Sequence, residues 1–128
     1  MSQRTLPQNS TLHQEDIMAF FTFKDLPQEY VTPMYSRAHG GLIQGESLEV
    51  GWLSFGAGQG AVEHAHPQEQ VMIVITGKLH VRFGDQEADL EPGQAFLAPP
   101  NVPHQVTAID DTVVISCKNL VGGVGHKI

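Results

Sequence analysis

The sequence predicts an all-β protein that folds as a jelly-roll barrel. Its 128 residues include 13 glycines and 8 prolines, and from residue 31 onward these interrupt the chain every few positions. Between them lie short apolar or alternating runs, and no stretch shows the sustained repeat of a long amphipathic helix. Short strands separated by frequent turn residues are typical of β-sandwiches and barrels, and tight hairpin turns favour antiparallel pairing.

Turn signals divide the chain into its expected elements. The Gly84-Asp85 pair is a strong hairpin signal, Gly40-Gly41 is interpreted as a turn, and the proline-rich stretch 99–103 is expected to be a rigid loop. Strands are expected over residues 42–44, 48–55, 70–76, 79–83, 87–91, 94–98, 105–109 and 112–118. Residues 17–23 predict a first strand, with a short helix as the alternative, and residues 25–29 predict one helical turn.

The length of the chain fits one domain with a single core. We divide it into an N-terminal arm over residues 1–16, a barrel over residues 17–120 and a C-terminal tail over residues 121–128. The arm is polar and aperiodic, so we expect it to be flexible. The tail contains three glycines, and we expect it to be held loosely.

The charge balance narrows the class of partner. The formal net charge of −7 arises from 14 acidic and 7 basic residues, which argues against nucleic acid or an anionic membrane as a partner. The single Cys117 excludes a disulfide within the chain. No apolar run approaches the ~20 residues that a membrane-spanning helix needs, and no secretory signal pattern is visible. We therefore expect a cytoplasmic protein with a small-molecule substrate.

Three histidines and a glutamine predict a metal site. His64 and His66 are separated by one residue, so on a strand both imidazoles point to the same side. Gln70 is a polar residue that enters an apolar strand, and a buried amide there needs a partner inside the protein. The proline-rich loop delivers His104 to the start of a later strand. Together these four side chains form a plausible set of metal ligands.

The two stretches that contain these residues resemble the two motifs of the cupin family. The spacing of the first motif is matched by Gly58, His64, His66, Gln70 and Gly77, and the second motif is matched by Pro92-Gly93 and His104. Together the motifs cover roughly residues 50–118. The resemblance implies a double-stranded β-helix (a jelly roll), a metal in the mouth of the barrel, and a homodimer.

Gln70 occupies the position where the first cupin motif usually has a glutamate. Three neutral imidazoles and a neutral amide would leave a divalent ion with its full charge. The ion would then be a stronger Lewis acid, which favours reactions in which the metal polarises a bound substrate group. We expect one divalent transition metal per chain, which is Zn, Ni, Fe or Mn, and the ligand set does not select among them.

The leading functional hypothesis is a metal-dependent isomerase or lyase that acts on a small hydroxy-acid, keto-acid or sugar acid. The first motif is similar to that of small cupins that linearise unsaturated uronates. Those proteins carry an acidic and an aromatic residue near the end of the last strand, where this chain has Ser116 and Lys118. Lys118 is in phase with Ser116, so it is the candidate catalytic or carboxylate-binding residue if that face lines the barrel.

Two alternatives remain open. One is an Fe(II)-dependent dioxygenase that cleaves a diketone or an aromatic acid, because three-histidine cupins include such enzymes. The other is a non-catalytic cupin that binds or senses a small molecule. Oxygen consumption by the iron-loaded protein would distinguish the first alternative from the leading hypothesis.

Several other residues receive simpler interpretations. His39 and His80 are expected to lie on the surface or to be satisfied locally, and no role is assigned to His13 or His126. Cys117 is expected to be a small core residue. Glu63 and Glu69 are candidates to hold the imidazole N–H groups, and the aromatic residues expected in the core are Trp52, Phe55, Phe83 and Phe96.

Overall fold

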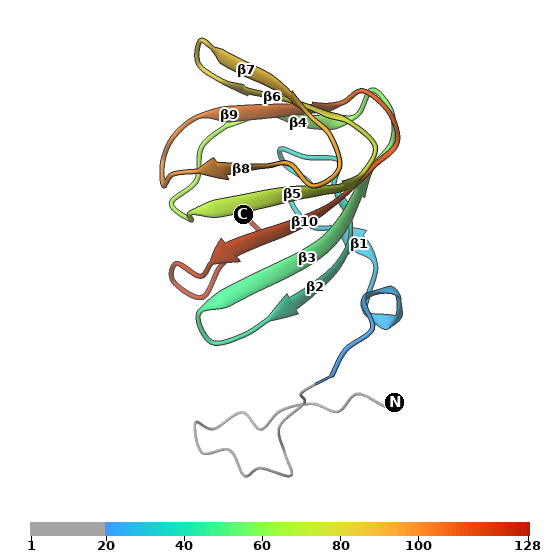
Figure 1. Cartoon of the computed structure of the whole chain (residues 1–128). Helices are drawn as coiled ribbons and strands as arrows, with labels where there is room; N and C mark the ends of the chain where they lie inside the picture. The colour runs from blue at the N-terminus through green and yellow to red at the C-terminus, as the bar shows by residue number, and fades with distance from the viewer. Residues whose placement is uncertain (1–19) are drawn as a thin grey trace, which may run out of the picture.

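The computed structural model describes residues 20–128, and its regular secondary structure consists almost entirely of strands (Figure 1). A short 3₁₀ helix, η2 (Phe23–Asp25), precedes the strands. The strands are β1 (Glu29–Tyr30), β2 (His39–Gln44), β3 (Leu48–Phe55), β4 (Gly60–His64), β5 (Gln70–Thr76), β6 (Leu79–Phe83), β7 (Gln86–Leu90), β8 (Ala95–Ala98), β9 (His104–Ala108) and β10 (Thr112–Asn119). Within this part of the chain, no helix has the length and apolar character needed to cross a membrane.

The strands form two antiparallel sheets. The larger sheet has the order β1-β2-β3-β10-β5-β8, and the smaller one has the order β4-β9-β6-β7. In Figure 1 the two sheets lie one above the other, and the chain crosses between them several times. This arrangement confirms the prediction of an all-β jelly roll.

The core lies between the two sheets. Along β10, buried and half-buried side chains alternate from Thr112 to Lys118, as the side-chain alternation of a strand requires. The same alternation on β5 buries Gln70, Met72 and Val74. The core contains apolar side chains of both sheets, including Leu53 and Phe55 of β3, Leu79 of β6 and Val106 of β9.

The sequence-based expectations at the start of the barrel are partly wrong. Residues 20–22 of the predicted strand 17–23 form no strand, and residues 17–19 lie outside the described residues, as does the arm 1–16. The helical turn begins at Phe23 and ends at Asp25 instead of covering residues 25–29. Gly40 and Gly41 belong to β2. A Cβ at Gly40 would overlap the carbonyl oxygen of Trp52, so this glycine marks close contact between neighbouring strands.

The C-terminal segment is not loose. Val121 and Val124 form a β-bridge, and the segment then turns into the barrel, where His126 is only 2% exposed. Gln68 Nε2 donates a hydrogen bond to the Val124 carbonyl (2.8 Å), and Thr32 Oγ1 donates to the His126 carbonyl (2.6 Å). The glycines of this segment therefore permit a specific path into the barrel.

Candidate metal centre

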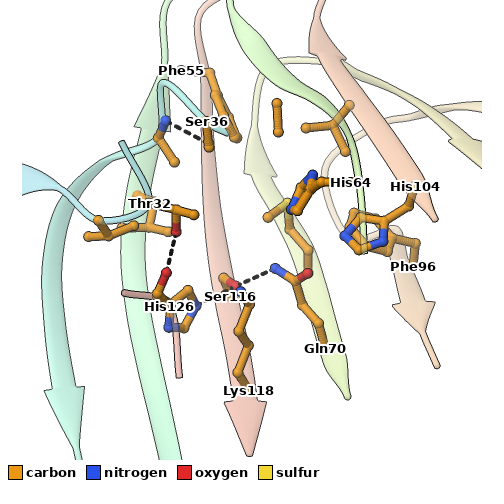
Figure 2. Close-up of a pocket in the computed structure, with 16 residues that line it drawn as sticks. Thr32, Ser36, Phe55, His64, Gln70, Phe96, His104, Ser116, Lys118 and His126 are labelled. Atoms are coloured by element: carbon orange, nitrogen blue, oxygen red, sulfur yellow. Dashed lines mark hydrogen bonds between the residues drawn. The ribbon is translucent and has the colours of Figure 1, made fainter. Parts of the chain in front are cut away.

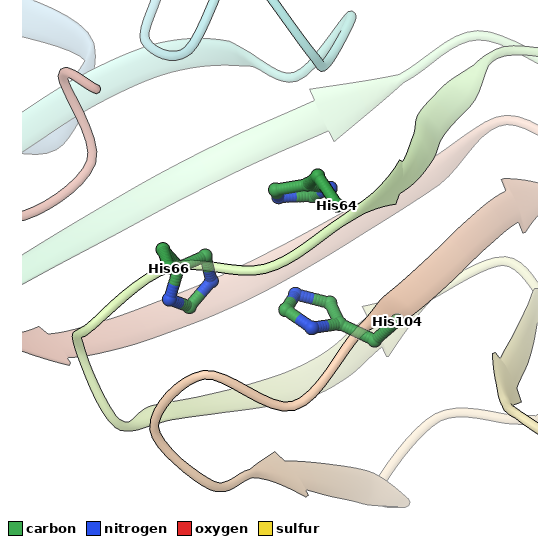
Figure 3. Close-up of side chains that lie close together, drawn as sticks. All are labelled: His64, His66 and His104. Carbon is green, nitrogen blue, oxygen red and sulfur yellow. The ribbon is translucent and has the colours of Figure 1, made fainter.

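The three predicted histidines meet at one point between the sheets (Figure 3). His64 ends β4 and His104 begins β9, and the two residues are register partners across the antiparallel pair. His66 lies just beyond β4, in a loop whose carbonyl at His66 accepts a hydrogen bond from the Asn101 backbone N–H (2.8 Å). One ring nitrogen from each histidine lies within 4.8 Å of the others, so together these residues could hold a metal ion.

The local explanation for His66 differs from the one that strand alternation predicts. β4 ends at His64, so the loop places His66 and the strand does not. Asn101 has a positive φ of 63°, a conformation that asparagine tolerates better than most residues. The proline-rich loop therefore contributes to the site twice, because it delivers His104 and also holds the backbone of His66.

Backbone carbonyl groups orient all three imidazoles. In each histidine Nδ1 faces a carbonyl oxygen, and the pairs are His64 with Val62 (2.7 Å), His66 with Gln68 (2.9 Å) and His104 with Val102 (2.9 Å). A neutral imidazole that donates from Nδ1 has a lone pair on Nε2. Glu63 and Glu69, the candidates for this orienting role, make none of these contacts, so that prediction is wrong.

Gln70 lies beside the three histidines and is 6% exposed. Its Oε1 is 3.1 Å from His66 Nε2, and its Nε2 donates to Ser116 Oγ (3.0 Å). His66 already donates from Nδ1, so its Nε2 lone pair and the amide oxygen are two acceptors that face each other. A cation bound by both atoms removes this conflict, and the donor set of three imidazoles and one amide oxygen suits a divalent transition metal.

Burial keeps the three histidines neutral, which is the form that binds a metal. Burial lowers the pKa of His66 to about 4, with smaller contributions from Lys118 and His104. It also lowers the pKa of His64 and of His104. The ligand nitrogens are therefore available near neutral pH without competition from protons.

The metal-free protein is expected to lose stability as the pH falls from about 6.5 to about 4. In the unfolded chain His66 has an ordinary pKa of about 6.5, and in the folded protein its pKa is about 4. Between these values the unfolded state binds more protons, so stability rises with pH and is lost on acidification. Thermal unfolding of the metal-free protein across this range measures the effect.

Two substitutions provide the control for this pH dependence. His66→Gln should flatten the acid side of the profile, because the residue with the depressed pKa is removed. His80 has the opposite shift, since hydrogen bonds to Asp89 and Glu87 raise its pKa; its contribution is complete below about pH 6.5, so His80→Gln should leave the slope between about 6.5 and 4 unchanged. An unchanged profile in His66→Gln would contradict the assignment.

Lys118 faces the same interior space as Gln70. It is 3% exposed, and it is the register partner of Gln70 on β5 and of Glu49 on β3. Burial lowers the pKa of its ammonium group to about 8, and the nearby Glu49 carboxylate partly opposes this shift. The face of β10 that carries Ser116 and Lys118 therefore lines the barrel, which is the condition that the sequence left open for Lys118.

One cavity inside the barrel is lined by His64, Gln70, His104 and Lys118 (Figure 2). Its volume is about 30 Å³, which is room for about two water-sized groups. Phe55 and Phe96 form part of its apolar wall. Tyr35 stacks on the His64 ring, with ring centroids 5.1 Å apart and planes 7° from parallel. The cavity can therefore hold a small polar group against the histidines while apolar surfaces exclude most water.

The remaining predicted residues lie away from this cavity. Trp52 is 41% exposed on the outer side of β3, so its predicted place in the core is wrong. Cys117 is half-buried on the side of β10 that faces away from Lys118. His80 lies on β6 between Asp89 (2.7 Å) and Glu87 (3.0 Å), where local carboxylates satisfy it as expected.

His126 is the residue of this region that the sequence analysis missed. Its Nε2 is 2.8 Å from Ser116 Oγ, and its Nδ1 is 2.6 Å from Glu49 Oε1. His126 follows a glycine-rich stretch and occupies no position that either cupin motif defines, so the motifs do not indicate its role. The one available signal was Glu49, an acidic residue in phase with the inward-facing Leu53 and Phe55 of β3, which needs a buried partner.

Solved structures share this fold. An RmlC-like cupin from Shewanella frigidimarina NCIMB 400 has a TM-score of 0.71 at 20% identity, over 82% of this chain and 93% of that chain. KdgF from Halomonas sp. has a TM-score of 0.70 at 24% identity, over 79% and 94%. The DMSP lyase DddQ from Ruegeria pomeroyi DSS-3 has a TM-score of 0.55 at 22% identity, over 59% and 40%. At these identities the similarity shows a common fold.

The sequence also matches a family model. The Cupin domain model matches residues 51–116, which is slightly more than half of the 128 residues. No curated protein matches the chain. The matched region begins within β3, ends within β10 and includes all three histidines. The chain therefore belongs to the Cupin domain family.

Proposed function

We propose that the protein is a metal-dependent isomerase or lyase that acts on a small hydroxy-acid, keto-acid or sugar acid. The observation that carries the proposal is the buried Lys118, which lines the same cavity as His64, His104 and Gln70. A divalent metal held by three imidazoles and an amide oxygen would act as a Lewis acid that polarises a substrate hydroxyl or carbonyl group. Lys118 supplies the positive charge that a carboxylate substrate needs.

Lys118 is suited to bind the carboxylate of the substrate. Lys118 is 3% exposed, and its ammonium group has no hydrogen-bond or ion-pair partner among the residues that the structure describes. Glu49 is its nearest source of negative charge, but the hydrogen bonds that Glu49 accepts come from His126 and Gln44. A substrate carboxylate would therefore compensate a charge that Glu49 compensates only in part.

The pKa of Lys118 also suits a role in proton transfer. At about 8, it lies close enough to neutral pH for the ammonium group to give up a proton and take it back. The small cavity admits a carboxylate or a hydroxyl-bearing carbon, while the rest of the substrate remains at the mouth of the barrel. A known DMSP lyase with this fold is compatible with lyase chemistry and does not define the substrate.

The experiment that tests the proposal combines metal reconstitution with a substrate panel. Protein loaded with Zn, Ni, Mn or Fe is assayed with unsaturated uronates and with small hydroxy- and keto-acids. For any substrate that turns over, Lys118→Met should lower kcat/KM by roughly 100-fold, because a buried charge partner of the carboxylate is lost. Lys118→Arg should retain binding better than turnover, since the guanidinium keeps its proton.

Lys78→Met is the matched control for the loss of one lysine. Lys78 is half-exposed and lies 4.0 Å from Glu91, in the turn between β5 and β6, so its substitution should leave kcat/KM unchanged. Equal activity of Lys118→Met and the wild type would refute the role of Lys118. Oxygen uptake by the iron-loaded protein with a diketone or an aromatic acid, without turnover of the acids above, would favour a dioxygenase instead.

A further inference from the structure

A buried series of polar side chains connects the C-terminal segment to the histidine cluster (Figure 2). It begins at Glu49 on β3, continues through His126 and Ser116, and ends at Gln70 on β5. The exposed fractions of these four side chains lie between 0% and 6%. Buried polar atoms need partners, and each side chain has a limited number of donors, so the direction of every hydrogen bond in the series can be derived.

Glu49 determines the direction at one end. Its Oε1 accepts from the backbone N–H of His126 (2.6 Å) and from His126 Nδ1 (2.6 Å). Burial alone would raise the pKa of Glu49, but the hydrogen bonds from His126 outweigh it and lower the pKa. Burial also lowers the pKa of His126. His126 is therefore neutral, with its proton on Nδ1 and an acceptor lone pair on Nε2.

Ser116 joins His126 to Gln70. The hydroxyl group has one proton, which it donates to His126 Nε2 (2.8 Å). The Ser116 oxygen is then free to accept from Gln70 Nε2 (3.0 Å). With its nitrogen held there, the amide of Gln70 has its oxygen directed at the histidine cluster, 3.1 Å from His66 Nε2.

We infer that Glu49, His126 and Ser116 are positioning residues that orient the amide oxygen of Gln70 toward the metal. Without them the amide can rotate by half a turn and present its NH₂ group, which repels a cation and has no lone pair to offer. The C-terminal segment is thus part of the metal centre, although it contributes no ligand. This inference depends on the metal site and is independent of the reaction that the site performs.

The path of the chain supports this role for the segment. A Cβ at Gly125 would lie 2.6 Å from Glu49 Oε1, so a glycine allows the backbone to bring His126 against the carboxylate. Thr32 Oγ1 also anchors His126, by donating to its carbonyl group (2.6 Å). Both contacts fix His126, but only the contact with Glu49 lies in the series that reaches Gln70.

Titration with Co²⁺, followed by the visible absorption of the bound ion, tests the inference without any substrate. Ser116→Ala and His126→Ala should weaken Co²⁺ binding by about 10- to 100-fold, the usual effect of removing a group that orients a ligand. The absorption band should also change, because the oxygen donor is no longer fixed. Ser116→Ala removes only a hydroxyl group, so it remains informative if His126→Ala does not fold.

A double-mutant cycle separates orientation of Gln70 from a general structural effect. In a Gln70→Ala background the amide is gone, so adding Ser116→Ala should cause no further loss of Co²⁺ affinity. Thr112→Val is the matched control, because it removes a buried hydroxyl group of β10 that donates to the Lys78 and Asp110 carbonyls and lies outside the series. It should lower the melting temperature and leave the Co²⁺ affinity unchanged.

Two results would overturn the inference. The first is an unaltered Co²⁺ affinity and absorption band in a folded Ser116→Ala protein. The second is an equal loss of affinity on adding Ser116→Ala to the wild type and to Gln70→Ala, since the serine would then act by a route that does not include Gln70. Neither result depends on whether an enzymatic activity has been found.

Discussion

Replacing His104 with alanine should abolish stoichiometric metal binding. His104 is 3% exposed, and its free ring nitrogen lies within 4.8 Å of those of His64 and His66. Alanine removes one of three imidazole ligands and leaves a space on one side of the site. The loss of affinity should exceed the roughly 100-fold upper end of the effect seen when a supporting group is removed.

Elemental analysis of the protein purified without added metal or chelator is the measurement. The wild type should contain about one equivalent per chain, and His104→Ala should contain almost none. His80→Ala is the control, because it removes a histidine that Asp89 and Glu87 hold on β6, away from the site. Full metal content in His104→Ala, or none in the wild type even after titration, would refute the metal centre.

Replacing Gly77 with alanine should cause a large loss of stability from a single methyl group. Gly77 has a φ of +87° in the turn between β5 and β6, and a Cβ there would overlap the Asp111 carbonyl oxygen and press against Thr112. The left-handed conformation costs an alanine about 1–2 kcal/mol. The overlap with the backbone adds about 1–3 kcal/mol if the neighbouring strand is displaced.

Gly84→Ala isolates the contribution of the overlap. Gly84 also has a positive φ, of 56°, but a Cβ there has no atom within 4 Å. Denaturant unfolding of both variants in the metal-free state should show the conformational cost alone for Gly84→Ala and a distinctly larger loss for Gly77→Ala. Equal losses in the two variants would show that the neighbouring strand accommodates the methyl group without cost.

Much of the barrel could be predicted because its strands are short, apolar and bounded by turn residues. The strands at 70–76 and 79–83 begin and end where the sequence predicts, since Gly77 and the Gly84-Asp85 hairpin leave little freedom at their ends. The predictions failed where tertiary contacts outweigh local signals. Gly40 and Gly41 are usual turn residues, but here Gly40 allows β2 to approach β3 closely, and Gly41 leaves room for Leu26 and the Phe23 carbonyl group.

The side chains that meet at the site were easier to predict than the groups that support them. Motif spacing identified the three histidines that meet, and side-chain alternation placed Gln70 and Lys118 on the inner face of their strands. The groups that orient the imidazoles are backbone carbonyls, which every residue possesses, so no side-chain pattern reveals them. His126 reaches the site from a segment without strand periodicity. The homodimer stays a prediction.

The position of β10 has a consequence for how the chain folds during synthesis. β10 lies between β3 and β5 in the larger sheet, yet among the ten strands it is the last to be made. Until residues 112–119 emerge, β3 and β5 each lack their shared neighbour, and two apolar strands with open edges are exposed to other nascent chains. The strand edges stay open until β10 has been made and has paired with both β3 and β5. Slower synthesis at low temperature prolongs this time, so it should not by itself reduce aggregation.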